Sequence, residues 1–179
     1  MYAGHSAVAL ALKGRHPDVA LFPLVLACFG PDWVDVILMV VSHYRSAELY
    51  SHSIPAVLIG ACVAGGLMAL FELRGAATVF AGWLLHWPAD LFTGLKPLFA
   101  VSPLIGMDLY HVPLADFLLE GALVCAGAAI YWRAFPATRR RTALVIATAL
   151  ALILSQAGVD RLIARTDSSG WHPSLAVAR

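Results

Sequence analysis

Charged residues are scarce in this sequence. Asp, Glu, Lys and Arg make up 13% of its 179 residues, whereas 60% of the residues are hydrophobic and the mean hydropathy is +0.79. Because soluble domains carry about 25% charged residues, this composition excludes an ordinary soluble domain and indicates a polytopic membrane protein. The formal net charge of +1 gives the chain no special attraction for nucleic acid.

Cysteine is also rare, and the sequence contains no Cys-x-x-Cys pair. Cys28, Cys62 and Cys125 lie far apart in apolar runs, so we interpret them as small buried hydrophobic residues without a disulfide or metal role. A signal peptide is not indicated either. The N-terminal apolar run precedes the basic residues Lys13 and Arg15, which is the reverse of the order in a signal peptide.

The sequence is rich in apolar segments of helical length. We expect six helical segments, at residues 1–12, 18–30 running into 31–41, 54–72, 76–95, 113–132 and 142–164. The last four have the roughly 20 residues needed to cross a bilayer, and the first two are short. The expected fold is an all-α polytopic membrane bundle of about six helices. It comprises one integral membrane domain over residues 1–165 and a polar C-terminal tail over 166–179.

Basic residues predict the orientation of this bundle. The connection 133–141 carries four arginines and should face the cytoplasm. Alternating crossings then place Arg74 and the turn at Lys13 and Arg15 on the same side. The N-terminus, the connections 31–53 and 96–112 and the tail should face outward, as in a protein of a bacterial-type inner (plasma) membrane.

Side chains of the kind that bind metals collect toward this outer face. In chain order they are His5, Asp32, Asp35, His43, His52, His86, Asp90 and His111. In the segment LLHWPADLFTG, His86 and Asp90 are four residues apart and share one helical face. Since an isolated charge is costly in apolar surroundings, the pair is either a pair of metal ligands or a hydrogen-bonded pair that satisfies two buried polar groups.

Two further segments offer candidates, each with a simpler alternative. In FGPDWVD, Asp32 and Asp35 repel each other unless a cation or protons neutralise them, although Asp32 could instead be a helix N-cap. In SHYRSAELYSHSIP, His52 precedes an apolar helix and could point back into the bundle or lie at the interface. Arg45 could bind a phosphate in a bidentate manner or be a solvated loop charge.

The segment MDLYHVPLADFLLE adds a third polar group. Asp116 and Glu120 are four residues apart on one face, and acids within membrane helices are rarely idle. However, Ala115 leaves His111 without an acidic partner four residues on. The roles of His111, Asp116 and Glu120, like that of His43, stay open at this point.

Taken in order, these motifs resemble a known family. Gly4–His5 opening an apolar helix, GPDxxD from Gly30 to Asp35, Ser-His-Ser at 51–53 and HxxxD from His86 to Asp90 are similar to the membrane-bound metal-dependent hydrolases of the YdjM type. That family looks like a distant membrane relative of the zinc-dependent phospholipases C and related single-strand nucleases. Those are all-α enzymes that hydrolyse phosphate esters with a cluster of zinc ions. The resemblance covers about residues 3–95.

The resemblance implies a metal site formed by His5, Asp32, His52, His86 and Asp90. It also implies that Asp32 touches metal and serves as general base, and that Asp90 bridges metals. The sequence departs from the family pattern because no further histidine follows in LFTGLK and because His43 and His52 are far apart. We therefore expect one or two Zn²⁺ ions, or Mn²⁺, rather than a cluster of three.

Residues and resemblance together predict a metal-dependent membrane hydrolase. It would act at the membrane interface on a phosphoester or other ester of a lipid-like substrate, using a metal-bound hydroxide. Asp32 would accept a proton, Asp35 would ligate or support the metal, and Arg45 or a second metal would neutralise developing charge. Membrane lipids and a lipid-like or phosphorylated substrate are the expected partners.

Two other classes of protein remain open. In a proton-coupled carrier, His86, Asp90, Asp116 and Glu120 would form a relay across the bundle. In a non-catalytic membrane protein, the histidines and acids would pair only to hold helices together, with each hydrogen bond contributing about 0.6–2 kcal/mol.

Overall fold

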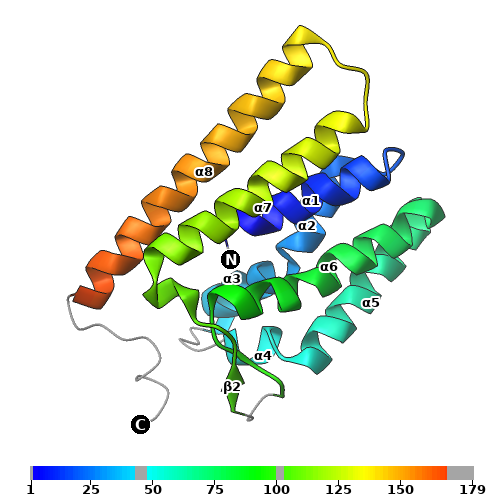
Figure 1. Ribbon diagram of the computed structural model, residues 1–179. Coiled ribbons are helices and arrows are strands. Elements are labelled where there is room, and N and C mark those ends of the chain that lie inside the picture. Colours follow the sequence, from blue (N-terminus) through cyan, green and yellow to red (C-terminus); the bar gives the residue numbers. More distant parts are fainter. Residues whose placement is uncertain (1, 43–47, 100–102, 169–179) are drawn as a thin grey trace.

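The computed structural model describes residues 2–42, 48–99 and 103–168. Figure 1 shows a helical protein with one small antiparallel hairpin. The helices are α1 (Ala3–Arg15), α2 (Leu21–Cys28), α3 (Gly30–Ser42), α4 (Glu48–Ser51), α5 (Ile54–Phe71), α6 (Leu73–Thr93), α7 (Pro113–Arg133) and α8 (Arg139–Ser168). The hairpin consists of β1 (Lys96–Pro97) and β2 (Leu104–Ile105), and the 3₁₀ turn η1 (Leu109–His111) follows it. The all-α class predicted from the sequence is confirmed.

The membrane-spanning helices differ from the four full crossings expected. By length and composition, α5, α7 and α8 can each cross a membrane, and α2 with α3 would make a fourth, broken span bent by 63°. The bend falls at Phe29, just before Gly30 and Pro31. Proline is favoured in the first turn of a helix, so Pro31 suits the start of α3. These helices are consistent with an integral membrane protein of three or four spans.

Helix α6, expected as a span over 76–95, is not among the candidate spans. It is 21 residues long, but His86, Pro88 and Asp90 lower its hydropathy. Both His86 and Asp90 are buried inside the protein. The polar residues that disqualify α6 as a simple span are therefore the ones that build the interior site.

Helix α1 lies among α7, α2 and α6, with α8 packed on α7 and α5 packed on α6 (Figure 1). One buried apolar cluster includes Ala9 of α1, Leu24 of α2 and Val79 of α6. Cys28 belongs to this cluster, as predicted, but Cys62 and Cys125 are exposed. The expectation that all three cysteines are buried is wrong for these two, because they lie on candidate spans whose outward faces would meet lipid rather than protein.

The indole of Trp83 on α6 packs closely against both α3 and α5. A Cβ atom at Gly30, the first residue of α3, would lie 2.3 Å from the Trp83 ring, and one at Gly60 of α5 would lie 2.5 Å from it. Trp83 lies one turn before His86 on α6. The two glycines therefore let α3 and α5 approach α6 at the level of the site.

The connections that carry the predicted basic residues lie at one end of the bundle. Figure 1 shows the α1–α2, α5–α6 and α7–α8 connections together toward the upper right. The ammonium of Lys13 lies 5.3 Å from the centroid of the Phe135 ring, which joins the end of α1 to the α7–α8 connection. The start of α1, the α4–α5 connection and the hairpin lie toward the opposite end.

Close packing of α1 against α7 gives a direct test of this arrangement. A Cβ atom at Gly127 would lie 2.3 Å from the carbonyl oxygen of Ala7. We expect Gly127→Ala to lower the free energy of unfolding by about 1–3 kcal/mol because the two helices must separate. Thermal unfolding in detergent measures the change. Gly121→Ala, on the same helix but with no atom within 4 Å of the added Cβ, should be neutral, and equal effects of the two changes would contradict this packing.

Candidate metal centre

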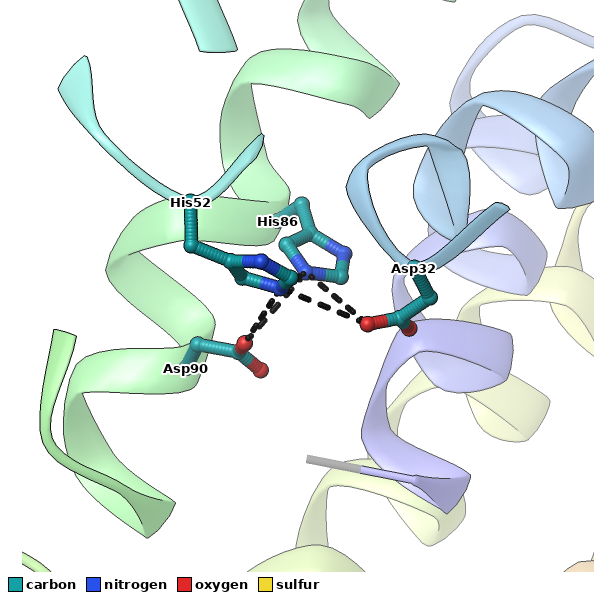
Figure 2. Close-up of side chains that lie close together, drawn as sticks. All are labelled: Asp32, His52, His86 and Asp90. Atoms are coloured by element: carbon teal, nitrogen blue, oxygen red, sulfur yellow. Dashed lines mark hydrogen bonds and ion pairs between the residues drawn. The ribbon is translucent and has the colours of Figure 1, made fainter. Parts of the chain in front are cut away.

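Four of the predicted ligands meet at one point. Asp32 comes from the first turn of α3, His52 from the connection between α4 and α5, and His86 and Asp90 from successive turns of α6 (Figure 2). One ligand atom from each residue lies within 4.8 Å of the other three, so this group could hold a metal ion. Segments separated by more than fifty residues thus converge as the sequence predicted.

The distances between the nitrogen and oxygen atoms of this cluster are close to those between neighbouring ligand atoms around one metal ion. Nε2 of His52 lies 3.0 Å from Nε2 of His86. Oδ1 of Asp32 lies 3.3 Å from Nε2 of His52 and 3.7 Å from Nε2 of His86. Oδ2 of Asp90 lies 3.4 and 3.3 Å from the same two nitrogens. A tetrahedral zinc site with bonds of about 2.0–2.1 Å has ligand-to-ligand edges of about 3.3–3.4 Å.

Hydrogen bonds behind the two imidazoles assign their tautomers. Nδ1 of His86 lies 2.8 Å from the carbonyl oxygen of Cys28, which can only accept, so Nδ1 carries the hydrogen and donates it. Nδ1 of His52 lies 3.1 Å from Oδ2 of Asp35 and 2.7 Å from Oγ of Ser51. With both imidazoles neutral, the two Nε2 lone pairs face each other. A positive charge between them, either a proton or a metal ion, removes this repulsion.

The carboxylates around His52 favour such a positive charge. Burial alone would lower the pKa of His52, but Asp32, Asp35 and Asp90 outweigh it and raise the pKa to about 10. A proton satisfies the two nitrogens only. A divalent cation would balance the two nitrogens and both facing carboxylates at once, and neutral imidazole with carboxylate is a ligand set that zinc accepts.

Three side chains of the cluster are buried and the fourth is partly exposed. The side chains of His52, His86 and Asp90 are at most 2% exposed, whereas that of Asp32 is 42% exposed. Asp32 is therefore the member of the group that solvent reaches.

Asp35 supports the cluster from behind rather than facing its centre. The sequence left open whether it is a ligand or a neighbour of the metal. The Asp35 carboxylate contacts Nδ1 of His52, the nitrogen that points away from the centre. Carboxylates in this position hold a ligating histidine in one orientation and tautomer, so the geometry fits Asp35 to a positioning role.

His5 lies beside the four-residue cluster. Its Nε2 is 3.0 Å from Oδ1 of Asp90, while Oδ2 of Asp90 faces the other two histidines. The His5 ring stacks on that of His86, with ring centroids 3.9 Å apart. In the part of the chain that the structure describes, the buried Nδ1 of His5 has no hydrogen-bond partner. Asp90 thus links His5 to the cluster through its two oxygens. His5, predicted as a ligand, is not part of the group of four found among the described residues.

Glu120, whose role was open, is a long-range cap of helix α1. Its carboxylate accepts hydrogen bonds from the backbone amides of Tyr2, at 3.0 Å, and Gly4, at 2.9 Å. The side chain of Gln156 accepts a bond from the amide of Ala3 at 3.3 Å. Because the first amides of a helix lack partners within it, these contacts fix the turn of α1 that carries His5.

Asp116 belongs to the same polar network on α7 and α8. The Gln156 amide donates to Oδ2 of Asp116 at 3.0 Å and to Oδ1 of Asp160 at 2.7 Å. Neither Asp116 nor Glu120 belongs to the His/Asp group that could hold a metal. His111 does not either: it is 53% exposed and lies 3.3 Å from Asp108.

One charged residue near the centre was missed by the sequence reasoning. Nζ of Lys96, on β1, lies 3.1 Å from Oδ2 of Asp90. A lysine is not a metal ligand, and nothing in the sequence around it signals a hairpin that returns to the site. Its isolation in the apolar run LFTGLKPLFA was the available sign. Two candidates, Arg45 and His43, lie outside the described residues, so neither the phosphate contact nor the solvated-charge alternative for Arg45 is tested.

In comparisons with known proteins, no family model, curated protein or solved structure matches this chain. The resemblance to the membrane-bound hydrolases therefore stays a prediction. The functional interpretation depends on the geometry of the cluster.

Proposed function

We propose that this protein is a metal-dependent hydrolase of a membrane, with its metal centre at Asp32, His52, His86 and Asp90. The supporting observation is the pair of imidazole Nε2 atoms that face each other at 3.0 Å, with a carboxylate oxygen of Asp32 and one of Asp90 beside them. A proton on His52 would satisfy these two nitrogens through one hydrogen bond. A divalent cation would also balance the carboxylates of Asp32 and Asp90 beside them, which is why we favour a metal ion. Zn²⁺ is the cation we favour, one or two ions in number, with Mn²⁺ as the alternative.

The roles of the chain's own residues follow from their burial. His52, His86 and Asp90 would hold the ion from the interior, and Asp35 would keep His52 in its ligating tautomer. Asp32, whose side chain is partly exposed, would accept a proton from an incoming water. When bound, a zinc ion would supply hydroxide near neutral pH, because it strongly lowers the pKa of the water bound to it.

The position of the centre supports a substrate at the membrane interface. The basic connections gather at the other end of the bundle (Figure 1), and basic connections prefer the cytoplasm. We therefore place the centre on the outer face of a bacterial-type plasma membrane. The substrate class that fits is a phosphoester or other ester of a lipid-like molecule.

One observation favours a proton-coupled carrier as the second candidate. The network of Glu120, Gln156, Asp116 and Asp160 is buried between α7 and α8, two candidate spans. However, Glu120 is occupied in capping α1, and this network is separate from the His/Asp group.

Metal content tests the proposal first. In protein purified in detergent, elemental mass spectrometry should find one or two zinc equivalents in wild type and none in His86→Ala. His111→Ala is the matched control, since His111 lies outside the cluster, and it should keep the metal. Loaded wild-type protein and the control should hydrolyse a lipid ester, and His86→Ala should not. No metal in the wild type after dialysis against zinc would leave only a hydrogen-bonded or proton-carrying cluster.

A further inference from the structure

Lys96 brings a positive charge to the edge of a cluster suited to a cation. Its Nζ lies 3.1 Å from Oδ2 of Asp90, the same oxygen that faces Nε2 of His86 at 3.3 Å. The Lys96 side chain is only 12% exposed, so water screens its charge weakly. An ammonium in this position competes with a metal ion for the carboxylate. A role limited to metal binding therefore does not explain it.

The hairpin holds the backbone of Lys96 beside the cluster, and a lysine side chain is flexible enough to change partner. Lys96 opens β1 and pairs with Ile105 of β2, a few residues after α6 ends at Thr93. A lysine ammonium offers three donors on a flexible four-carbon chain. Because this ammonium contacts the oxygen of Asp90 that faces His86, an anion held by a cation at that oxygen would lie beside Lys96.

We propose that Lys96 is an anion-binding residue of this centre, which holds an anionic oxygen of the substrate. With a cation neutralising Asp90, the ammonium of Lys96 would be released to such an oxygen through a charge-assisted hydrogen bond. A neutral carboxylic ester has no anionic oxygen for Lys96 to bind, so the residue would select for anionic substrates. This inference rests on the proposed metal-dependent activity and adds a specificity-determining residue to it.

Two titrations on the full chain in detergent test the proposal. The first measures zinc binding by calorimetry, and the second measures inorganic phosphate binding to protein loaded with one zinc equivalent. Four proteins are compared: wild type, Lys96→Gln, Lys96→Arg and Lys13→Gln. Lys13 is the other lysine of the sequence and lies at the opposite end of α1, bonded to the carbonyl oxygen of Val19.

Lys96→Gln should bind phosphate about 10- to 100-fold more weakly than wild type while binding zinc equally or more tightly, because a competitor for Asp90 is gone. Lys96→Arg should recover most of the phosphate affinity, and Lys13→Gln should match wild type. The opposite directions of the zinc and phosphate effects separate an anion-binding lysine from one that only neutralises Asp90. Repeating the second titration with phosphatidic acid in mixed micelles distinguishes a lipid phosphate from a free one.

The outcomes separate this inference from the proposed function. Tight zinc binding with the same phosphate affinity in wild type and Lys96→Gln overturns the anion role and leaves the metal centre standing. If wild type binds no zinc, the proposed function fails and the inference fails with it. If Lys96→Gln does not fold, Lys96→Arg is compared with wild type instead. An affinity loss of tenfold or more despite the retained charge would then contradict the proposal.

Discussion

Asp90→Asn is expected to abolish tight metal binding while keeping the shape of the site. Asp90 is the residue on which the cluster converges: its two oxygens contact His5, His86, His52 and Lys96 within 3.4 Å. Asparagine preserves the volume but removes the charge that a divalent cation needs beside two neutral imidazoles. We expect zinc affinity to fall by more than about 100-fold, beyond the loss of 10- to 100-fold typical for a supporting group.

A graded series makes this prediction specific. Asp35→Ala removes the carboxylate behind Nδ1 of His52, so it should weaken zinc binding by about 10- to 100-fold. Asp108→Asn, beside His111 and outside the cluster, should change nothing. Competition with a fluorescent zinc chelator ranks the three variants, and circular dichroism checks that each is helical. If Asp35→Ala loses more zinc affinity than Asp90→Asn, then Asp35 is the ligand and Asp90 the supporting residue, which contradicts the roles assigned here.

The candidate site was predictable from sequence wherever local spacing carried the information. His86 and Asp90 are four residues apart in a helix, so their common face could be read from the sequence alone. Asp32 and His52 could be added because the expected topology brought both to the same end. Which nitrogen of His52 faces the centre, and hence the position of Asp35, could not be predicted, because it depends on a side-chain contact between α3 and the α4–α5 connection.

Long-range polar contacts were not predictable. Glu120 binds amides more than a hundred residues away in the chain, and no pattern within α7 indicates that partner. Lys96 reaches Asp90 only because a short hairpin follows α6. Acids and a lysine in an apolar run signal that partners exist, and only the packing of the helices says which ones.

The fold was predictable in its class but not in its division into spans. The length of the apolar runs correctly predicted α5, α7 and α8 as candidate membrane spans. In the stretch 18–41, the proline at position 31 starts a new helix at an angle, so one apolar run became α2 and α3. Helix α6 is long enough to cross a membrane, but its polar residues keep it from being a candidate span. Those polar residues face the interior of the protein, where the site lies.

Glu120→Ala is expected to destabilise the whole protein, not only the site. Gly4 is buried, and its amide donates to Glu120 at 2.9 Å. Removing the carboxylate leaves that amide and the partly buried amide of Tyr2 without this acceptor, and it removes a negative charge from the positive end of the α1 dipole. Each buried group left without a partner costs about 1–3 kcal/mol. We expect the free energy of unfolding to fall by roughly 2–5 kcal/mol, measured by thermal unfolding in detergent.

Two matched variants on the same helix show whether the cap is the cause. Glu120→Gln keeps an oxygen that can accept from one amide, so its stability should lie between those of wild type and Glu120→Ala. Leu118→Ala shortens a side chain that is 60% exposed and should cost little. Because α1 carries His5, which stacks on His86, Glu120→Ala should also weaken zinc binding, although it removes no ligand. If Glu120→Ala is as stable as Leu118→Ala and binds zinc as tightly, the cap is not the cause. The position of α1 and the contact between His5 and Asp90 would then not depend on the Glu120 carboxylate.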